Sequence, residues 1–125
     1  MNVERKNYPH LAQPVGPYVH AVKHNGFLFL SGLTAFGSSA QGRGVAEQAD
    51  AIFAQITSIA EAERSSLSAL VKVTIFVTSF DGITPLRESL FRHYGSHLPA
   101  SSLVQVAQLF SAEINIEVEA ILAVP

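Results

Sequence analysis

Two short β-prone runs near the N-terminus, residues 18–24 and 27–33, are separated by the dipeptide Asn25-Gly26. Both residues of such a turn need a positive φ angle, and Asn-Gly between two such runs is the strongest short-range signal for a β-hairpin. Proline and glycine in residues 13–17 predict a shaped loop before the hairpin. We expect the polar segment that precedes this loop to be extended.

Apolar residues recur at the spacing of a helix face over residues 45–63. The positions on this face are Val45, Ala49, Ile52, Ile56, Ile59 and Ala60. Glu47 and Asp50 lie near the start and Arg64 lies at the end, which suits the helix dipole. The pattern therefore predicts an amphipathic helix.

A second helix is predicted after Thr84-Pro85, which has the form of an N-cap followed by proline at the first helical position. It runs to about residue 94, and Gly95 is a natural stop. Its apolar stripe consists of Leu86, Leu90 and Tyr94.

Alternating apolar residues predict three more strands, at residues 70–78, 101–107 and 114–124. The apolar face is Val71, Val73, Ile75 and Val77 in the first of these strands, and Ile116, Val118, Ala120, Leu122 and Val124 in the last. The order ββαβαββ predicts an α+β fold in which both helices cover one face of a single sheet. The opposite face mixes apolar residues with Lys72, Thr74, Gln105, Glu117 and Glu119. Such a face favours sheet-to-sheet packing in an oligomer.

The composition narrows the class of protein. The length of 125 residues suits one domain, residues 1–125, and 48% of the residues are hydrophobic while only 14% are charged. The net charge is −2 and the Lys and Arg residues are scattered, so nucleic acid is a poor candidate for a partner. There is no cysteine, no apolar leader at the N-terminus and no run long enough to span a membrane. We expect a cytoplasmic protein.

Several segments, taken in order, resemble the RidA/YjgF family, also called L-PSP or translation-initiation-inhibitor-like proteins. They are PVGPYVHAV (residues 14–22), FLFLSGLTA (27–35), LVKVTIFVTSFD (70–81), HLPASSLVQVA (97–107) and IEVEAILA (116–123). With the amphipathic helix between them, the resemblance covers nearly the whole chain.

The resemblance implies a chorismate-mutase-like fold and a homotrimer whose sheets form a central barrel, with small-molecule clefts between subunits. The implied activity is cofactor-independent hydrolysis of enamines or imines to keto acids and ammonia. In family members with this activity, the turn before the fourth strand reads Pro-Ala-Arg-Ser, and its arginine binds the substrate carboxylate. Here the turn reads Pro99-Ala100-Ser101-Ser102, so Ser101 stands at the arginine position.

Two residues bear on this missing cation. Ser101 either contacts a ligand through its hydroxyl or is an ordinary residue at the start of a strand. Arg87 lies near the start of the second helix, where a cation opposes the helix dipole. It either supplies the missing charge to the cleft or extends into solvent.

The resemblance assigns roles to five further residues. Glu117 matches the cleft glutamate that orients or activates water, and its alternative role is that of a polar strand residue. Tyr18 matches the cleft tyrosine, and its alternative role is that of a core aromatic residue. Ser31 and Gly32 end the second strand, where glycine allows close approach of a ligand, and Leu103 follows the arginine position.

We expect no metal site, because no HExxH or similar motif occurs and the histidines are poorly spaced for one metal. The leading hypothesis is therefore a cofactor-independent enamine or imine deaminase with altered recognition of the acid group. The alternative is a non-catalytic ligand-binding or regulatory trimer. A ribonuclease is disfavoured, because the sequence offers neither a basic groove nor an evident pair of acid–base histidines.

Overall fold

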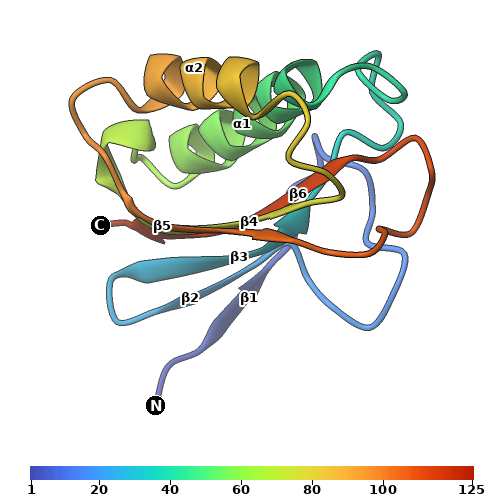
Figure 1. Ribbon diagram of the computed structural model, residues 1–125. Coiled ribbons are helices and arrows are strands. Elements are labelled where there is room, and N and C mark those ends of the chain that lie inside the picture. Colours follow the sequence, from blue (N-terminus) through green and yellow to red (C-terminus); the bar gives the residue numbers. More distant parts are fainter.

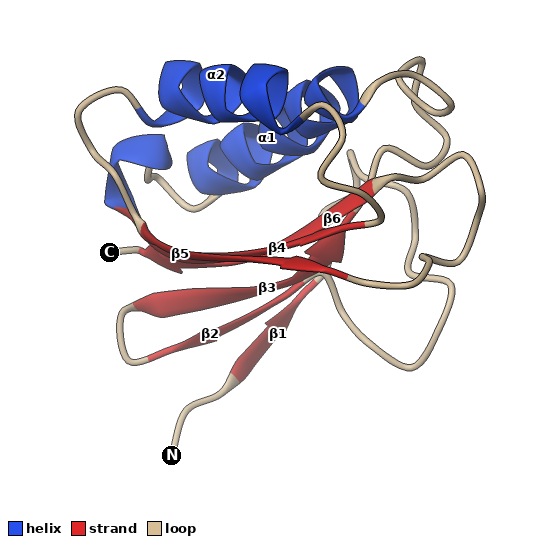
Figure 2. Cartoon of the chain, in the orientation of Figure 1, coloured by secondary structure: helices blue, strands red, loops and turns tan.

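The computed structural model describes all residues, 1–125. Two helices lie on one face of a six-stranded sheet, and the other face is uncovered (Figures 1 and 2). The strands are β1 (Glu4–Lys6), β2 (Ala21–His24), β3 (Phe27–Leu33), β4 (Leu70–Val77), β5 (Ala100–Gln105) and β6 (Ile116–Ala123). The helices are α1 (Val45–Ala62), α2 (Ile83–Tyr94) and the short 3₁₀ helix η1 (Leu67–Ala69). The predicted α+β class, with both helices on one face, is confirmed.

The sheet has the strand order β1-β2-β3-β6-β4-β5. All neighbouring strands are antiparallel except β4 and β5, which are parallel and are joined through α2. A parallel pair needs such a crossover, because a tight turn can only reverse the chain. The topology places β6 in the interior of the sheet, between β3 and β4.

The predicted hairpin is present, and it pairs β2 with β3. Its turn residues have the expected positive φ angles, 51° at Asn25 and 79° at Gly26. The first strand of the hairpin begins at Ala21 rather than at residue 18, so Tyr18 belongs to the preceding loop. That loop contains Pro14 and Pro17, which have no N–H group to donate to a strand ladder.

The extended N-terminal segment contains a strand that the ββαβαββ order lacks. This strand, β1, pairs with the outer edge of β2, with Glu4 opposite Lys23 and Lys6 opposite Ala21. The three residues of β1 are all polar, so they show no alternation of apolar and polar side chains. The sequence pattern therefore gave no signal for this strand.

Helix α1 is confirmed within one residue of its predicted end. Its apolar face is completely buried at Ala49, Ile52, Phe53, Ile56, Ile59 and Ala60. Burial of one large aliphatic or aromatic side chain stabilises a fold by about 1.5–3 kcal/mol. This stripe therefore attaches α1 firmly to the sheet.

The start of helix α2 differs from the prediction. The helix begins at Ile83, its N-cap is Gly82 with a left-handed φ of 80°, and Thr84 is not the cap. Pro85 is thus the third helical residue, a position that tolerates proline because N–H groups of the first turn have no acceptor within the helix. Gly95, with a φ of 59°, ends the helix as predicted.

At the start of strand β4, the side chains that point into the core differ from those that the alternation predicted. Val71 is 41% exposed while Leu70 is buried, because the pairing with β6 is irregular between Leu70 and Lys72. From Val73 onward, the predicted inward face is confirmed.

Strands β5 and β6 differ from the predicted ranges only at their ends. β5 begins one residue before Ser101 and ends at Gln105, and β6 covers Ile116–Ala123. The apolar face predicted for β6 is buried at Ile116, Val118, Ala120 and Leu122. The alternation in β6 turns Glu117 and Glu119 toward the uncovered face of the sheet.

The uncovered face also exposes apolar side chains in this single chain. Phe27, Phe29 and Val104 lie on it and are each about two-fifths exposed. Lys72, also on this face, donates a hydrogen bond to the hydroxyl of Ser102 at 2.9 Å. None of the helices is long and apolar enough to cross a membrane.

Candidate functional site

A cavity of about 490 Å³ lies where β3 ends and β6 begins, beside the loop that precedes β2. It contains four of the residues singled out in the sequence, namely Tyr18, Ser31, Gly32 and Glu117. The other lining residues are Leu11, Ala12, Gln13, Pro14, Val15, His20, Leu33, Thr34, Phe36, Gln55 and Phe110.

Glu117 is the only acidic side chain in this cavity, and it is half-buried. Its carboxylate takes part in no hydrogen bond or ion pair within the chain. Burial, together with the nearby charge of Glu119, raises the pKa of Glu117 above its ordinary value. A carboxylate with a raised pKa and no partner is suited to accept a proton from water, which is the role of a general base.

Gly32 makes room for this carboxylate. A Cβ atom at position 32 would lie 2.8 Å from the side-chain carboxyl carbon of Glu117, which is closer than real contacts of this kind. The sequence suggested that this glycine admits a ligand. In the chain alone, the adjacent glutamate side chain occupies the space that a larger residue would fill.

Ser31 lies at the cavity, and both of its polar groups are bound to the loop before β2. Its hydroxyl donates to the carbonyl of Val19 at 2.6 Å, and its N–H donates to the carbonyl of His20 at 3.0 Å. These bonds hold the loop, and with it Tyr18, against the end of β3. The ring of Tyr18 packs on Gly16 and remains 48% exposed, so Tyr18 is a wall of the cavity rather than a core residue.

His20 also lines the cavity, but both ring nitrogens are engaged in the loop. Nδ1 accepts a hydrogen bond from the N–H of Tyr8 at 2.9 Å, and Nε2 lies 2.8 Å from the carbonyl of Ala12. An acceptor at Nδ1 and a donor at Nε2 define the neutral Nε2–H tautomer. Neither nitrogen is left to exchange a proton with a ligand.

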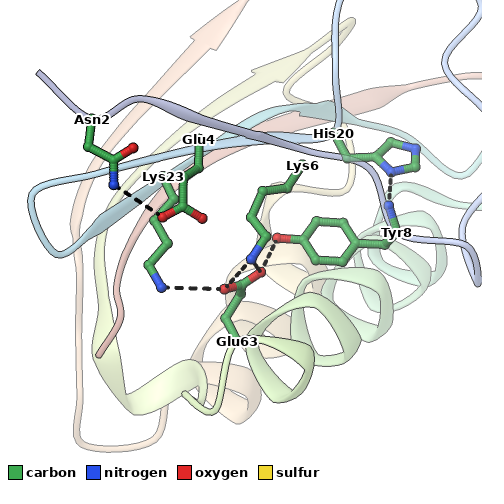
Figure 3. Close-up of polar contacts among 7 residues, drawn as sticks. All are labelled: Asn2, Glu4, Lys6, Tyr8, His20, Lys23 and Glu63. Carbon is green, nitrogen blue, oxygen red and sulfur yellow. Dashed lines mark hydrogen bonds and ion pairs between the residues drawn. The ribbon is translucent and has the colours of Figure 1, made fainter.

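The loop is anchored further by Glu63, at the end of α1 (Figure 3). The Glu63 carboxylate accepts hydrogen bonds from Lys6 at 3.0 Å and from the hydroxyl of Tyr8 at 2.9 Å, and Lys23 lies 3.8 Å away. Burial opposes ionisation of Glu63, but these bonds and the two lysine charges outweigh it and lower its pKa. Burial and the same hydrogen bond raise the pKa of Tyr8. Because Tyr8 also bonds to His20, the anchor reaches the cavity wall.

The other three residues singled out in the sequence do not line this cavity. Ser101 and Leu103 lie on β5, an edge strand that β4 separates from β6. Leu103 packs against the core while Ser101 is exposed. Arg87 is exposed in α2 and makes no ion pair or hydrogen bond within the chain. The chain alone therefore does not bring Arg87 or Ser101 to Glu117.

Among the cavity residues that the sequence did not single out, three contribute an amide and two aromatic rings. Gln55 extends from α1 and donates from Nε2 to the carbonyl of Thr34 at 2.9 Å. Phe36 and Phe110 meet edge to face with ring centroids 5.2 Å apart. Both rings are more than half exposed, and they come from loops far apart in the sequence, so no local pattern relates them.

No group of three or more His, Asp or Glu side chains is arranged to hold a metal ion. The chemistry available in the cavity is thus that of one carboxylate, one phenol, two amides and two aliphatic hydroxyls beside apolar walls. The fold and cavity together define a small α+β protein with a ligand-sized cavity beside an open sheet.

Comparison with known proteins identifies the family. The sequence model described as "Endoribonuclease L-PSP" matches residues 9–124. A RutC family protein of Aquifex aeolicus is 35% identical over 119 residues, covering 90% of this chain and 94% of that protein. The crystal structure of RidA from an Antarctic Psychrobacter matches with a TM-score of 0.79 and 31% identity, covering 89% of this chain and 91% of that one. The chain belongs to the RidA/YjgF (L-PSP) family.

One relative carries the name of an activity. A protein of Dermatophagoides farinae named 2-iminobutanoate/2-iminopropanoate deaminase is 29% identical over 119 residues, which covers 93% of this chain and 92% of that protein.

Proposed function

We propose that this protein hydrolyses enamines or imines without a cofactor, and that Glu117 is the catalytic residue. The observation that carries the proposal is the half-buried, unpartnered carboxylate of Glu117 in a ligand-sized cavity. The name of the deaminase relative supports the same reaction class.

The reaction needs only a bound substrate and a placed water. An enamine first tautomerises to its imine, and water then adds to the carbon of the C=N bond while Glu117 accepts a proton from that water. Glu117 delivers this proton to the nitrogen, which gives a neutral carbinolamine. Glu117 then transfers the hydroxyl proton of the carbinolamine to its amino group, and the C–N bond breaks as the C=O bond forms. The products are a carbonyl compound and ammonia, and Glu117 ends in its starting state.

The proposed assembly is a homotrimer with its ligand sites between subunits. Two observations support it: the open sheet face exposes Phe27, Phe29 and Val104, and the three remaining family positions lie away from the cavity. A neighbouring copy would bring β5 and α2 to the cavity of the first. Light scattering of the purified protein should give three times the chain mass of 13.4 kDa. A monomer would contradict the proposed assembly.

Serine at position 101 should weaken the binding, and therefore the hydrolysis, of substrates that carry a carboxylate. A lost hydrogen bond to a charged group weakens binding by about 1.5–3 kcal/mol, which is one to two decades in affinity. We therefore expect weak or no release of ammonia from freshly generated 2-aminoacrylate. Ser101→Arg should raise this activity, and Glu117→Gln should abolish what is present.

If Arg87 supplies the missing cation, Arg87→Ala abolishes the remaining activity, and an unchanged rate would exclude that role.

The alternative function is a non-catalytic ligand-binding trimer in the cytoplasm. The single chain contributes no Lys or Arg to the cavity, and this favours the non-catalytic alternative. A site can keep its shape and bind a ligand after the residue that held the substrate carboxylate has been replaced. A ligand that raises the melting temperature without being turned over would support this alternative. Turnover that disappears in Glu117→Gln would exclude it.

A further inference from the structure

The charge of the cavity restricts what it can bind. None of the lining residues that one chain supplies is Lys or Arg, and both ring nitrogens of His20 are engaged by Tyr8 and Ala12. Glu117 is the one carboxylate that a single chain contributes to the cavity. A carboxylate that entered this space would meet a like charge in partly desolvated surroundings, with no cation of the same chain to offset it.

Two side chains of the cavity offer hydrogen-bond acceptors that have no partner within the chain. The carboxylate oxygens of Glu117 have no partner, and the Oε1 atom of Gln55 accepts no bond because the side chain is held through its Nε2 atom. Acceptors of this kind bind N–H groups, which imines, iminium ions and amides all possess. The Tyr18 hydroxyl and the Gln13 amide, which make no hydrogen bond within the chain, can both donate and accept, and the Thr34 hydroxyl can donate.

The walls of the cavity are apolar. Phe36 and Phe110 are 58% and 65% exposed, although rings of this size are usually buried, and they meet edge to face at the cavity. Val15, which is 95% exposed, lies beside the same space. A flat apolar group on a ligand would cover these side chains and remove their surface from water.

On these grounds we infer that the cavity takes imines or enamines that carry an apolar, preferably aromatic, group and no carboxylate. The inference rests on the proposed function, and it changes the substrate class from imino acids to carboxylate-free imines. The reaction is R–CH=NH + H2O → R–CHO + NH3. The C=N bond is replaced by C=O, and no oxidant or reductant is needed.

The first test measures binding, so it does not depend on catalysis. Phenylacetamide and phenylacetate have nearly the same shape and differ in charge, and each is titrated into the assembled protein by calorimetry at pH 7. We expect the amide to bind at least tenfold more tightly. Equal or tighter binding of phenylacetate would overturn the inference, and so would the failure of both compounds to bind at millimolar concentrations.

Variants assign the preference to the cavity. Glu117→Gln removes the like charge, so it should improve phenylacetate binding and reduce the preference for the amide. Phe110→Ser should weaken amide binding severalfold. Phe80→Ser is the matched control, because Phe80 is 48% exposed in the loop between β4 and α2 and does not line the cavity. Equal effects of the two serine variants would contradict the assignment.

The second test compares two imines that differ only in the carboxylate. A flavin amine oxidase forms one from 2-phenylethylamine, and a flavin L-amino-acid oxidase forms the other from phenylalanine. Semicarbazide traps each imine, and hydrolysis by this protein lowers the trapped amount. Faster loss of the imine from 2-phenylethylamine supports the inference, whereas faster loss of the imine from phenylalanine overturns it and leaves the deaminase proposal standing. If the amide binds but neither imine is hydrolysed, the deaminase proposal fails. The inference that the cavity prefers ligands without a carboxylate is then still supported.

Discussion

Gly32 and Glu117, on adjacent strands, determine the shape of the cavity at the scale of single residues. Glycine at position 32 leaves the space that the carboxylate of Glu117 occupies, and burial beside β3 raises the pKa of that carboxylate. The sequence suggested both residues through the family resemblance. It did not indicate that the two depend on each other, because they are far apart in the chain.

We expect Gly32→Ala to move the carboxylate of Glu117 out of its place and to reduce ligand binding and activity. The atom displaced is the end of a flexible side chain, so the free energy of unfolding should change by less than about 1 kcal/mol. A crystal structure and a urea titration of the variant measure the two effects.

Gly44→Ala is the control for this variant, because a Cβ atom there would meet nothing within 4 Å and the φ angle is an ordinary −65°. An unmoved Glu117 side chain in Gly32→Ala would show that the glycine is not needed for its placement.

At the scale of elements, Glu63 joins the N-terminal strand to the end of the first helix. Its carboxylate contacts Lys6 from β1, Lys23 from β2 and Tyr8 from the loop (Figure 3). A three-residue edge strand makes few ladder bonds of its own, so this anchor supplies much of what holds it in place. The anchor also fixes the loop that forms the cavity wall.

We expect Glu63→Gln to destabilise the protein by about 1–3 kcal/mol, because a buried carboxylate that accepts charge-assisted bonds is replaced by a neutral amide. The matched control is Glu61→Gln, since Glu61 is exposed on the same helix and has no bonded partner. That change should alter stability by no more than about 0.5 kcal/mol. Urea unfolding monitored by circular dichroism gives both values, and equal effects would remove the role assigned to Glu63.

The elements also show where sequence patterns are reliable. Helix α1 and the Asn25-Gly26 hairpin follow from local periodicity and turn chemistry, and both were predicted correctly. The inward face at the start of β4 was predicted wrongly, because an irregularity in its pairing with β6 moved Val71 outward. Pairing irregularities depend on the partner strand, which a local pattern does not contain.

At the scale of the whole molecule, buried and partly buried carboxylates link elements that are far apart in the sequence. Asp50 of α1 accepts hydrogen bonds from Ser89 at 2.6 Å and from His93 at 2.8 Å, both on α2, and Arg92 lies 3.8 Å away. Burial opposes ionisation of Asp50, but these hydrogen bonds and cationic partners outweigh it and lower its pKa below 3.8. Glu63 behaves in the same way, with a pKa below its ordinary value of 4.5.

Stability should therefore fall in acid. The unfolded chain takes up protons at Asp50 and Glu63 at a higher pH than the folded chain does, so their contribution is complete above the ordinary pKa values and decreases from about pH 5 downward. Glu117 has the opposite sign, because its pKa is raised in the folded chain. Urea midpoints measured across this range should show a net loss in the unaltered protein and a smaller one in Asp50→Asn with Glu63→Gln. Parallel curves would contradict this account.

The sequence by itself determined the α+β class, both helices, the hairpin and most of the inward faces, because these depend on residues that are near neighbours in the chain. Through the family resemblance it also predicted that Ser101 stands at the arginine position of the Pro-Ala-Arg-Ser turn. Only the tertiary structure decided that Glu117 has no partner, that His20 is unavailable for proton transfer and that Phe36 meets Phe110. These features arise where distant segments pack together, since burial and hydrogen-bond partners are properties of the folded chain.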